Sequence, residues 1–369
     1  MKLKVMVVAG ARPNFMKIAP VLAELERRSH DAILVHTGQH YDASMSQAFF
    51  DDLGIRAPDH YLDVGGGSHA AQTARIMERF EPVLLDARPD WVVVPGDVNS
   101  TLAASLVTVK LREETGARLA HLEAGLRSHD WRMPEEVNRV LTDRCSDLLL
   151  TPSRDAHEHL RGEGIPDGRV RFVGNIMIDT LLGRLEAARD LDVPGRLGLV
   201  RGRYAAATLH RPSNVDTPAA LAVCLEALGS IAERMPVVLP LHPRTRERAR
   251  SFGLDRLLHR VTVTEPLGYT EMLSLTDGAA VVLTDSGGLQ EETTVLGIPC
   301  VTLREQTERP ITLSDGTNRL APWPLTVAGV VAAFEDALAA GRREGGCTIE
   351  GWDGRTAKRT VDALEDHVA

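Results

Sequence analysis

Several side chains that can transfer protons stand directly after short apolar runs of this chain. Asp97, Glu123 and His210 each occupy such a position, and carboxylates and imidazoles commonly act as general acids and bases. Each has a structural alternative: Asp97 would suit the cap of a following helix, and a single histidine at a strand end is more often a satisfied structural group. Burying the charge of Glu123 at the end of a buried strand would cost free energy unless the carboxylate is paired or hydrated. The number of such residues favours a functional site.

The segment GARPNFMKIAP at 10–20 is a candidate anion site. Gly10 permits a tight turn between a strand and a helix, and Pro13 suits a first helical turn. Arg12 and Lys17 would flank the helix start, where backbone N–H groups already favour a negative charge. The alternative is a turn that carries a solvated arginine and a solvated lysine. Of the two, we expect the anion-binding role.

A second candidate anion site is LTDSGGLQEETTVLG at 283–297. The backbone N–H groups of Ser286, Gly287 and Gly288 would face an anion at a helix start. Glu291 and Glu292 follow within one helical turn, although carboxylates repel a bound anion. The segment taken alone leaves this juxtaposition unexplained.

The composition argues against several classes of protein. A net charge of -9 over 369 residues does not favour nucleic acid as a partner, because phosphate backbones require clustered lysine and arginine. The four cysteines show no paired spacing, so neither a disulfide framework nor a metal site is indicated. No G-x-G-x-x-G motif follows the first apolar run, so no nicotinamide cofactor is expected. Without an apolar run of roughly 20 residues or a signal peptide, we expect a cytoplasmic protein with no membrane partner.

Short β-branched apolar runs alternate with amphipathic helical segments along the chain. This pattern predicts parallel sheets that helices cover on both faces. The length favours two domains, and a Pro- and Gly-rich segment at 191–203 indicates a linker. The strands are expected within the segments 3–10, 32–38, 91–97, 117–125, 147–153, 169–175, 204–210, 236–243, 261–266, 280–288 and 299–305.

The expected fold class is therefore α/β, with two Rossmann-like doubly wound domains facing across a cleft. Residues 1–180 would form the first domain, which the C-terminal helix at 352–369 would join, and residues 181–351 would form the second. In such sheets, ligands bind outside the carboxyl ends of the strands. The candidate residues stand at those ends in both halves of the chain, so we expect them to share one site.

Eight motifs in order resemble the UDP-N-acetylglucosamine 2-epimerase family. The resemblance extends from Val5 to about Arg319, and it rests on GARPNFMKIAP, PGD, HLEAGLRS, PEEVNR, GNIMIDTL, TLHRPSNVD, LTDSGGLQEE and TERP. It implies a GT-B-type fold and a UDP-sugar substrate, with no cofactor. It also implies reversible epimerisation of UDP-N-acetylglucosamine and UDP-N-acetylmannosamine at carbon 2. In that reaction UDP is eliminated to give 2-acetamidoglucal and is then added back.

The resemblance implies catalytic roles for Asp97, Glu123, Glu135 and His210. Asp97 and Glu123 are expected to flank the sugar ring, and which of them is the acid and which the base stays open. His210 would either donate a proton or hold a phosphate oxygen. Glu135 has a structural alternative, since an acid in the first turn of a helix interacts favourably with its dipole by about 0.3–1 kcal/mol.

The resemblance also explains the two acids in the segment at 283–297. The phosphates of UDP would bind at the helix start, while Glu292 would accept hydrogen bonds from the two ribose hydroxyls. Glu291 would then do no more than favour the helix dipole. The implied substrate contacts are Arg12, Lys17, Arg139, Ser286, Gly287, Gly288, Glu292 and Arg309.

Regulation and three alternative functions stay open. Gln39 and His40 match a pair that contributes to an allosteric UDP-N-acetylglucosamine site in family members, which are commonly homodimers. A hydrolysing epimerase, which releases N-acetylmannosamine and UDP, would use much the same residues. An epimerase of a related UDP-diacetamido sugar is a second alternative. A GT-B glycosyltransferase is a third, but it would not explain HLEAGLRS and PEE.

Overall fold

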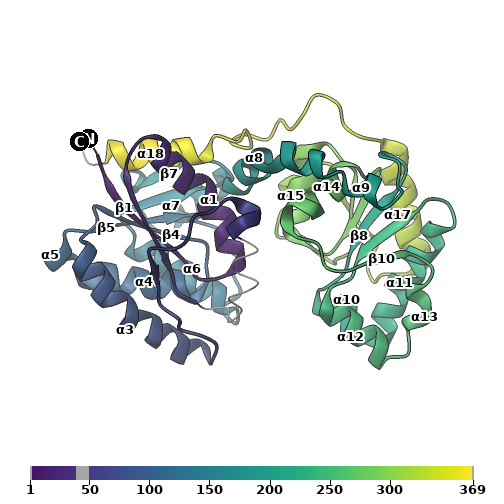
Figure 1. The fold of residues 1–369 in the computed structure, drawn as a ribbon, viewed down its shortest axis with the longest axis horizontal. Helices are drawn as coiled ribbons and strands as arrows, with labels where there is room; N and C mark the ends of the chain where they lie inside the picture. Colours follow the sequence, from purple (N-terminus) through teal and green to yellow (C-terminus); the bar gives the residue numbers. More distant parts are fainter. Residues whose placement is uncertain (1, 39–49, 368–369) are drawn as a thin grey trace. The chain divides into compact units, whose positions relative to one another are not determined.

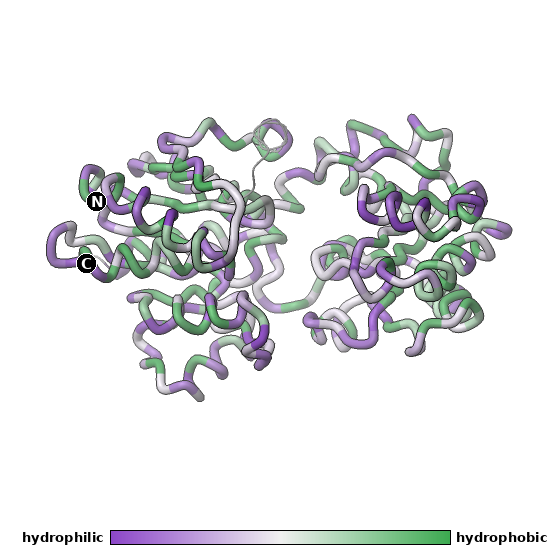
Figure 2. Tube along the Cα trace, turned by 90° about the horizontal axis from the view of Figure 1, so that it is seen from below, coloured by the Kyte–Doolittle hydropathy of each residue, from purple (hydrophilic) through white to green (hydrophobic). Residues whose placement is uncertain are grey.

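The computed structural model describes residues 2–38 and 50–367. The chain divides into two compact units, which are labelled by element in Figure 1. Unit 1 contains Met1–Gly183 and Glu350–Ala369, and unit 2 contains Arg184–Ile349. In each unit, apolar residues gather along the inner strands and helices, while hydrophilic residues prevail on the outer turns (Figure 2).

Unit 1 is built on a parallel sheet with the strand order β3-β2-β1-β4-β5-β6-β7. The order reverses between β1 and β4, which makes the sheet doubly wound. All five residues of β4 are buried, because helices cover both faces of the sheet. The strands are β1 (Lys4–Ala9), β2 (Asp31–His36), β3 (His60–Tyr61), β4 (Trp91–Pro95), β5 (Arg118–Leu122), β6 (Leu148–Thr151) and β7 (Val170–Phe172).

Two pairs of helices in unit 1 pack closely together. α3 and α4 pack together and bury Phe80 and Val107 against the sheet. α1 packs against α18, the last helix of the chain, and Arg28 donates to Glu365 at 2.7 Å. The helices are α1 (Arg12–Arg27), α3 (His69–Ala87), α4 (Asn99–Lys110), α5 (Arg112–Thr115), α6 (Pro134–Cys145), α7 (Arg154–Gly162), the 3-10 turn η1 (Asp167–Arg169) and α18 (Thr356–Asp366). A further helix, α8 (Ile176–Leu191), begins in unit 1 and ends in unit 2.

Unit 2 repeats this strand order as β10-β9-β8-β11-β12-β13, again with parallel pairs. The reversal lies between β8 and β11. Leu228 of α11 and Phe334 of α17 belong to the apolar core on one face of the sheet. The strands are β8 (Ala205–Thr208), β9 (Val237–Pro240), β10 (Thr262–Thr264), β11 (Val281–Thr284), β12 (Cys300–Thr302) and β13 (Asn318–Leu320).

Short helices follow most strands of unit 2 at their carboxyl ends. α15 begins three residues after β11 and is the helix of the second candidate anion site. The helices are α9 (Val193–Arg196), α10 (Pro212–Val215), α11 (Pro218–Ala232), α12 (Pro243–Ser251), α13 (Asp255–Leu258), α14 (Tyr269–Asp277), α15 (Gly287–Leu296), α16 (Ile311–Ser314) and α17 (Val327–Ala340).

The structure differs from the sequence prediction in two respects. β3 and β13 were missed, because both are short edge strands without an apolar run. The segment at 191–203 is folded into unit 2 instead of forming a free linker. The N–H of Val193 donates to Ser274 Oγ at 3.1 Å, and the N–H of Gly202 donates to the Gly278 carbonyl at 2.7 Å.

A buried carboxylate explains why this segment is ordered. Asp277, at the end of α14, forms ion pairs with Arg189, Arg201 and Arg342. These arginines come from α8, from the segment at 191–203 and from the residues just after α17. The Asp277 carboxylate thus links these three segments through ion pairs.

Candidate active site

Candidate residues lie where the strand order of each sheet reverses. In unit 1, Asp97 follows β4, whose neighbour is β1. In unit 2, His210 follows β8 and Asp285 directly follows β11, and these strands are also neighbours. The loops at such a switch point diverge to opposite faces of the sheet and leave room for a ligand.

The turn between β1 and α1 is closed by Asn14. Its buried Oδ1 accepts the N–H groups of Gly10 and Ala11 at 3.1 and 3.2 Å, and its amide donates to the Pro95 carbonyl at 3.2 Å. The turn after β1 is thereby tied to the end of β4. These two N–H groups are therefore engaged within the protein, and the predicted anion site at the start of α1 stays a prediction.

Lys17 forms an ion pair with Glu123, and both side chains are almost buried. Glu123 adopts a φ of 73° immediately after β5, a conformation that is uncommon for residues other than glycine and that recurs at functional sites. A Cβ atom on Gly96 would lie 2.8 Å from Lys17 Nζ, so glycine lets the turn after β4 approach this pair. Lys17 therefore neutralises a catalytic candidate, and its predicted contact with substrate stays a prediction.

Asp97 forms an ion pair with Arg139 of α6, and its carbonyl accepts the Asn138 amide at 2.9 Å. Burial tends to raise the pKa of Asp97, but the positive charges of Lys17 and Arg139 outweigh it, and the net pKa is lowered. Asp97 is therefore ionised at neutral pH. An ionised carboxylate can take a proton or stabilise positive charge in a substrate.

The two acids at the start of α6 differ in role. Glu136 is buried and accepts the N–H groups of Ser128 and His129, each at 2.9 Å, and it pairs with Arg139 at 3.0 Å. Burial tends to raise the pKa of Glu136, but these hydrogen bonds lower it overall. Glu135 is half-buried, and it has no hydrogen-bonding partner among the described residues. Glu136 thus anchors the preceding loop, while the catalytic role expected of Glu135 stays a prediction.

His210 is oriented by a carboxylate that sequence reasoning missed. Asp285 is fully buried, lies 2.8 Å from Nδ1 of His210, and accepts the N–H groups of His210 and Arg211 at 3.0 and 2.9 Å. Burial tends to raise the pKa of Asp285, but the hydrogen bond and charge of His210 help to lower it overall. An ionised Asp285 requires a proton on Nδ1, so Nε2 is the nitrogen left for a ligand. The available signal was an aspartate directly after a buried strand.

The start of α15 carries two glycines that no packing constraint explains. Ser286 precedes the helix without capping it through its side chain. A Cβ atom on Gly287 or Gly288 would meet nothing within 4 Å, and neither has a positive φ. Their absent side chains therefore leave open space above the backbone N–H groups, as the expected phosphate site requires.

The two glutamates of α15 also differ. Glu291 pairs with Arg309 at 2.8 Å. The sequence predicted that Glu291 does no more than favour the helix dipole, so this ion pair is an additional role. Glu292 is buried, and burial together with the neighbouring charge of Glu291 raises its pKa to about 8. Without a ligand, Glu292 is therefore largely protonated at neutral pH. A carboxyl group held in this way is a notable candidate for function.

Comparison with known proteins assigns the chain to a family. The profile described as UDP-N-acetylglucosamine 2-epimerase matches residues 23–365. The chain belongs to the UDP-N-acetylglucosamine 2-epimerase family. It is an enzyme of that family, as its motifs predicted, and its two Rossmann-like α/β units agree with the predicted fold.

Relatives of the epimerase family show the extent of the similarity. The chain is 40% identical to the UDP-N-acetylglucosamine 2-epimerase of Methanococcus maripaludis, over 86% of this chain and 87% of that protein. It is 44% identical to the UDP-2,3-diacetamido-2,3-dideoxy-D-glucuronate 2-epimerase of Pseudomonas aeruginosa, over 86% and 88%. The crystal structure of Methanocaldococcus jannaschii UDP-GlcNAc 2-epimerase in complex with UDP-GlcNAc and UDP aligns with a TM-score of 0.83 and 37% identity, covering 99% and 100%.

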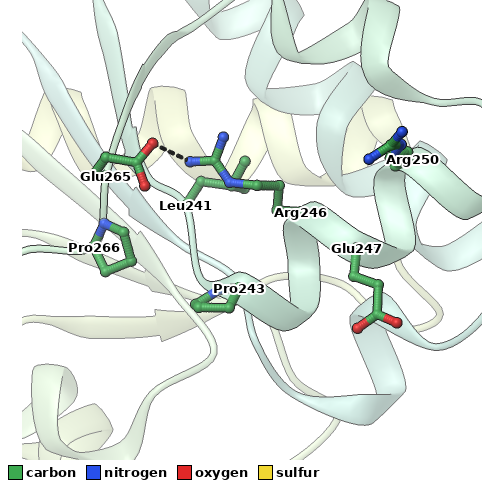
Figure 3. Close-up of a pocket in the computed structure, with 7 residues that line it drawn as sticks. All are labelled: Leu241, Pro243, Arg246, Glu247, Arg250, Glu265 and Pro266. Atoms are coloured by element: carbon green, nitrogen blue, oxygen red, sulfur yellow. Dashed lines mark hydrogen bonds and ion pairs between the residues drawn. The ribbon is translucent and has the colours of Figure 1, made fainter. Parts of the chain in front are cut away.

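Two neighbouring pockets open at the carboxyl ends of the strands of unit 2. One, of about 250 Å³, is lined by His210, Leu267, Met272 and Ser286, among others. The other, of about 430 Å³, is shown in Figure 3, where Arg246 points toward Glu265 at 2.7 Å. Arg246 is thus neutralised by an acid, while Arg250 also lines this pocket. The smaller pocket, which joins an imidazole to the open start of α15, is the better candidate for an epimerase ligand.

Some expectations for this epimerase-family chain fall outside the description. Gln39, His40 and the side chain of Arg12 lie outside the described residues. Among the residues that are described, no group of three or more His, Cys, Asp or Glu is placed to hold a metal ion. No described helix is both long enough and apolar enough to cross a membrane.

Proposed function

We propose that this protein interconverts UDP-N-acetylglucosamine and UDP-N-acetylmannosamine by inverting carbon 2, without net hydrolysis. One observation carries the proposal. Asp97 and Glu123 stand on loops after the neighbouring strands β4 and β5, and each is paired with a cation. Inversion requires a proton to leave one face of carbon 2 and another to reach the opposite face, so two titratable groups are needed.

The reaction proceeds in two balanced halves. A carboxylate takes the proton from carbon 2, the electron pair of that C–H bond forms the C1–C2 double bond, and the bond from carbon 1 to the UDP oxygen breaks. A proton then adds to the opposite face of carbon 2, and the same UDP oxygen bonds to carbon 1 again. Carboxylates can stabilise the positive charge that develops at carbon 1 as UDP departs.

In this proposal, unit 2 binds the nucleotide. The phosphates would accept hydrogen bonds from the N–H groups at the start of α15, where Gly287 leaves space. Nε2 of His210, oriented by Asp285, would face the phosphate oxygen that leaves carbon 1. The ribose hydroxyls would donate to Glu292, and Arg309, held by Glu291, would approach the phosphates.

A second candidate substrate is UDP-2,3-diacetamido-2,3-dideoxy-D-glucuronate. It is favoured by the 44% identity to the Pseudomonas aeruginosa enzyme named for that substrate, against 40% to the Methanococcus maripaludis UDP-N-acetylglucosamine 2-epimerase. Both substrates have an epimerisable carbon 2 that carries an acetamido group. The two acids of unit 1 therefore serve either substrate.

Incubation of the protein with each UDP-sugar in heavy water tests the proposal. Proton NMR should show deuterium at carbon 2 of both UDP-N-acetylglucosamine and UDP-N-acetylmannosamine. Exchange with the diacetamido substrate alone would establish the second candidate. Free N-acetylmannosamine with an equal amount of UDP would indicate a hydrolysing enzyme. Neither exchange nor turnover, in protein that still binds UDP, would rule out the epimerase proposal for both sugars.

We also propose that the protein acts in the cytoplasm as a homodimer. The four cysteines are all free in the structure, which suits a reducing compartment. The homodimer rests on the resemblance to the epimerase family. Light scattering during size-exclusion chromatography tests it, and a mass of one 40.2 kDa chain would contradict it.

A further inference from the structure

His121 lies on β5 beside both candidate acids and has no exposed surface. Its Nε2 lies 2.7 Å from the carbonyl oxygen of Gly96, and its Nδ1 lies 2.6 Å from Oδ1 of Asp143. A carbonyl oxygen can only accept a hydrogen bond, so Nε2 must carry a proton. If Asp143 is ionised, Nδ1 must carry one as well, and the ring is then an imidazolium.

The surroundings of Asp143 favour its ionised form. Oδ2 pairs with Arg127 at 2.7 Å and accepts the N–H of Gly125 at 3.2 Å. Arg127 is itself buried and pairs with Glu163 at 2.6 Å. Charges therefore alternate from Glu163 through Arg127 and Asp143 to His121, which is how buried charges are tolerated.

The two ends of this contact set lie on the loops that carry the candidate acids. Gly96, whose carbonyl receives the His121 hydrogen bond, immediately precedes Asp97. Gly125, whose N–H reaches Asp143, lies two residues after Glu123. A movement of His121 or Asp143 would therefore shift both loops together.

We propose that His121 and Asp143 form a buried imidazolium–carboxylate pair that positions Asp97 and Glu123 for proton transfer. Both are positioning residues, because each side chain is fully buried and acts through the loops that it holds. The positioning role rests on the proposed function. The charge state of His121 does not, so the two can be tested separately.

The charge state can be measured on the unaltered protein by NMR of ¹⁵N-labelled histidine. At about pH 8, both ring nitrogens of His121 should carry protons, because each faces an oxygen that accepts a hydrogen bond. A His121→Gln variant assigns the signals by their loss. A ring nitrogen of His121 without a proton at this pH would overturn the ion pair.

The positioning role can be measured with Asp143→Asn. Its amide can still hydrogen-bond to Nδ1, but it cannot hold a second proton on the ring. We expect kcat to fall by about 10²-fold, while KM and the Kd for UDP change less than about threefold, since unit 2 is untouched. A purely structural role would lower the melting temperature and leave kcat per folded molecule unchanged.

Asp147→Asn is a matched control from the same unit. Asp147 pairs with Arg112 at 2.6 Å and accepts the N–H of Leu119 at 2.8 Å, at the opposite end of β5. It should lower stability without changing kcat. Unchanged kcat in folded Asp143→Asn would overturn the positioning role. If Asp143→Asn does not fold, His121→Gln provides the same comparison.

The outcomes distinguish this inference from the proposed function. If the unaltered protein exchanges no proton at carbon 2 of either UDP-sugar, the proposed function fails, and the positioning role fails with it. The NMR signature of His121 is still expected in that case. If exchange occurs but His121 is neutral, the proposed function stands and the ion pair is wrong.

Discussion

Nδ1 of His210 lies 2.8 Å from the buried carboxylate of Asp285. The same carboxylate accepts the backbone N–H groups of His210 and Arg211, so it holds both the ring and the loop that carries it. The two residues follow neighbouring strands of the sheet, although 75 positions separate them in the chain. This arrangement leaves Nε2 as the nitrogen that can act on a ligand.

Asp285→Asn should lower kcat by about 10²–10⁴-fold. The asparagine oxygen can still accept the backbone N–H groups, so the loop is kept. Its NH₂ group can instead face Nδ1 and force the ring proton onto Nε2. Initial rates of UDP-sugar interconversion measure the effect. Asp216→Asn, which removes surface ion pairs to Arg244 and Arg248, is the control and should change little. Full activity of Asp285→Asn would refute the orienting role.

Asp97→Asn should abolish deuterium exchange at carbon 2 while leaving the Kd for UDP within about threefold. The reason is that the carboxylate is paired with Arg139 in unit 1, whereas the proposed nucleotide contacts are in unit 2. Exchange is followed by proton NMR in heavy water, and UDP binding by calorimetry. A large loss of UDP binding would show that Asp97 is chiefly structural.

Glu292→Gln should change how stability depends on pH. The pKa of Glu292 is raised from an ordinary 4.5 to about 8, so the folded chain binds this proton more tightly than the unfolded chain. The contribution of Glu292 is thus most favourable below about pH 4.5, is lost as pH rises toward about 8, and is constant above that value. Glutamine carries no charge, so the variant should melt higher than the unaltered protein at about pH 9 and similarly at about pH 5. If the melting temperatures of the two proteins differed by the same amount at every pH in this range, the raised pKa would be contradicted.

Two glycine substitutions should separate ligand approach from packing. In Gly10→Ala, the new Cβ would overlap Ser100 and lie 2.8 Å from Thr37 Oγ1, which should lower the free energy of unfolding by about 1–3 kcal/mol.

In Gly287→Ala, the Cβ meets no protein atom within 4 Å, so stability should hold or rise by up to about 1 kcal/mol. The Kd for UDP should nevertheless rise about tenfold, or about 1.4 kcal/mol. Unchanged UDP binding would exclude a ligand from the space above Gly287.

Most of the fold could be predicted from local sequence. Strands that are buried on both faces, such as β4 and β11, are continuous apolar runs, and these were found. The edge strands β3 and β13 were missed, because an edge strand has only one neighbour and its sequence needs no apolar run. The ordered motifs identified the family, since many matches in one order are specific.

The sequence by itself determined the family, the α/β alternation and the positions of the candidate acids, because each of these depends on residues close together in the chain. Only the tertiary structure decided the pairings. Lys17 neutralises Glu123 from 106 residues away, Asp285 orients His210, and Asp143 pairs with His121. These contacts arise because doubly wound sheets place distant strands side by side. Charge state then follows from burial and from the nearest partner, and neither can be read from residue type alone.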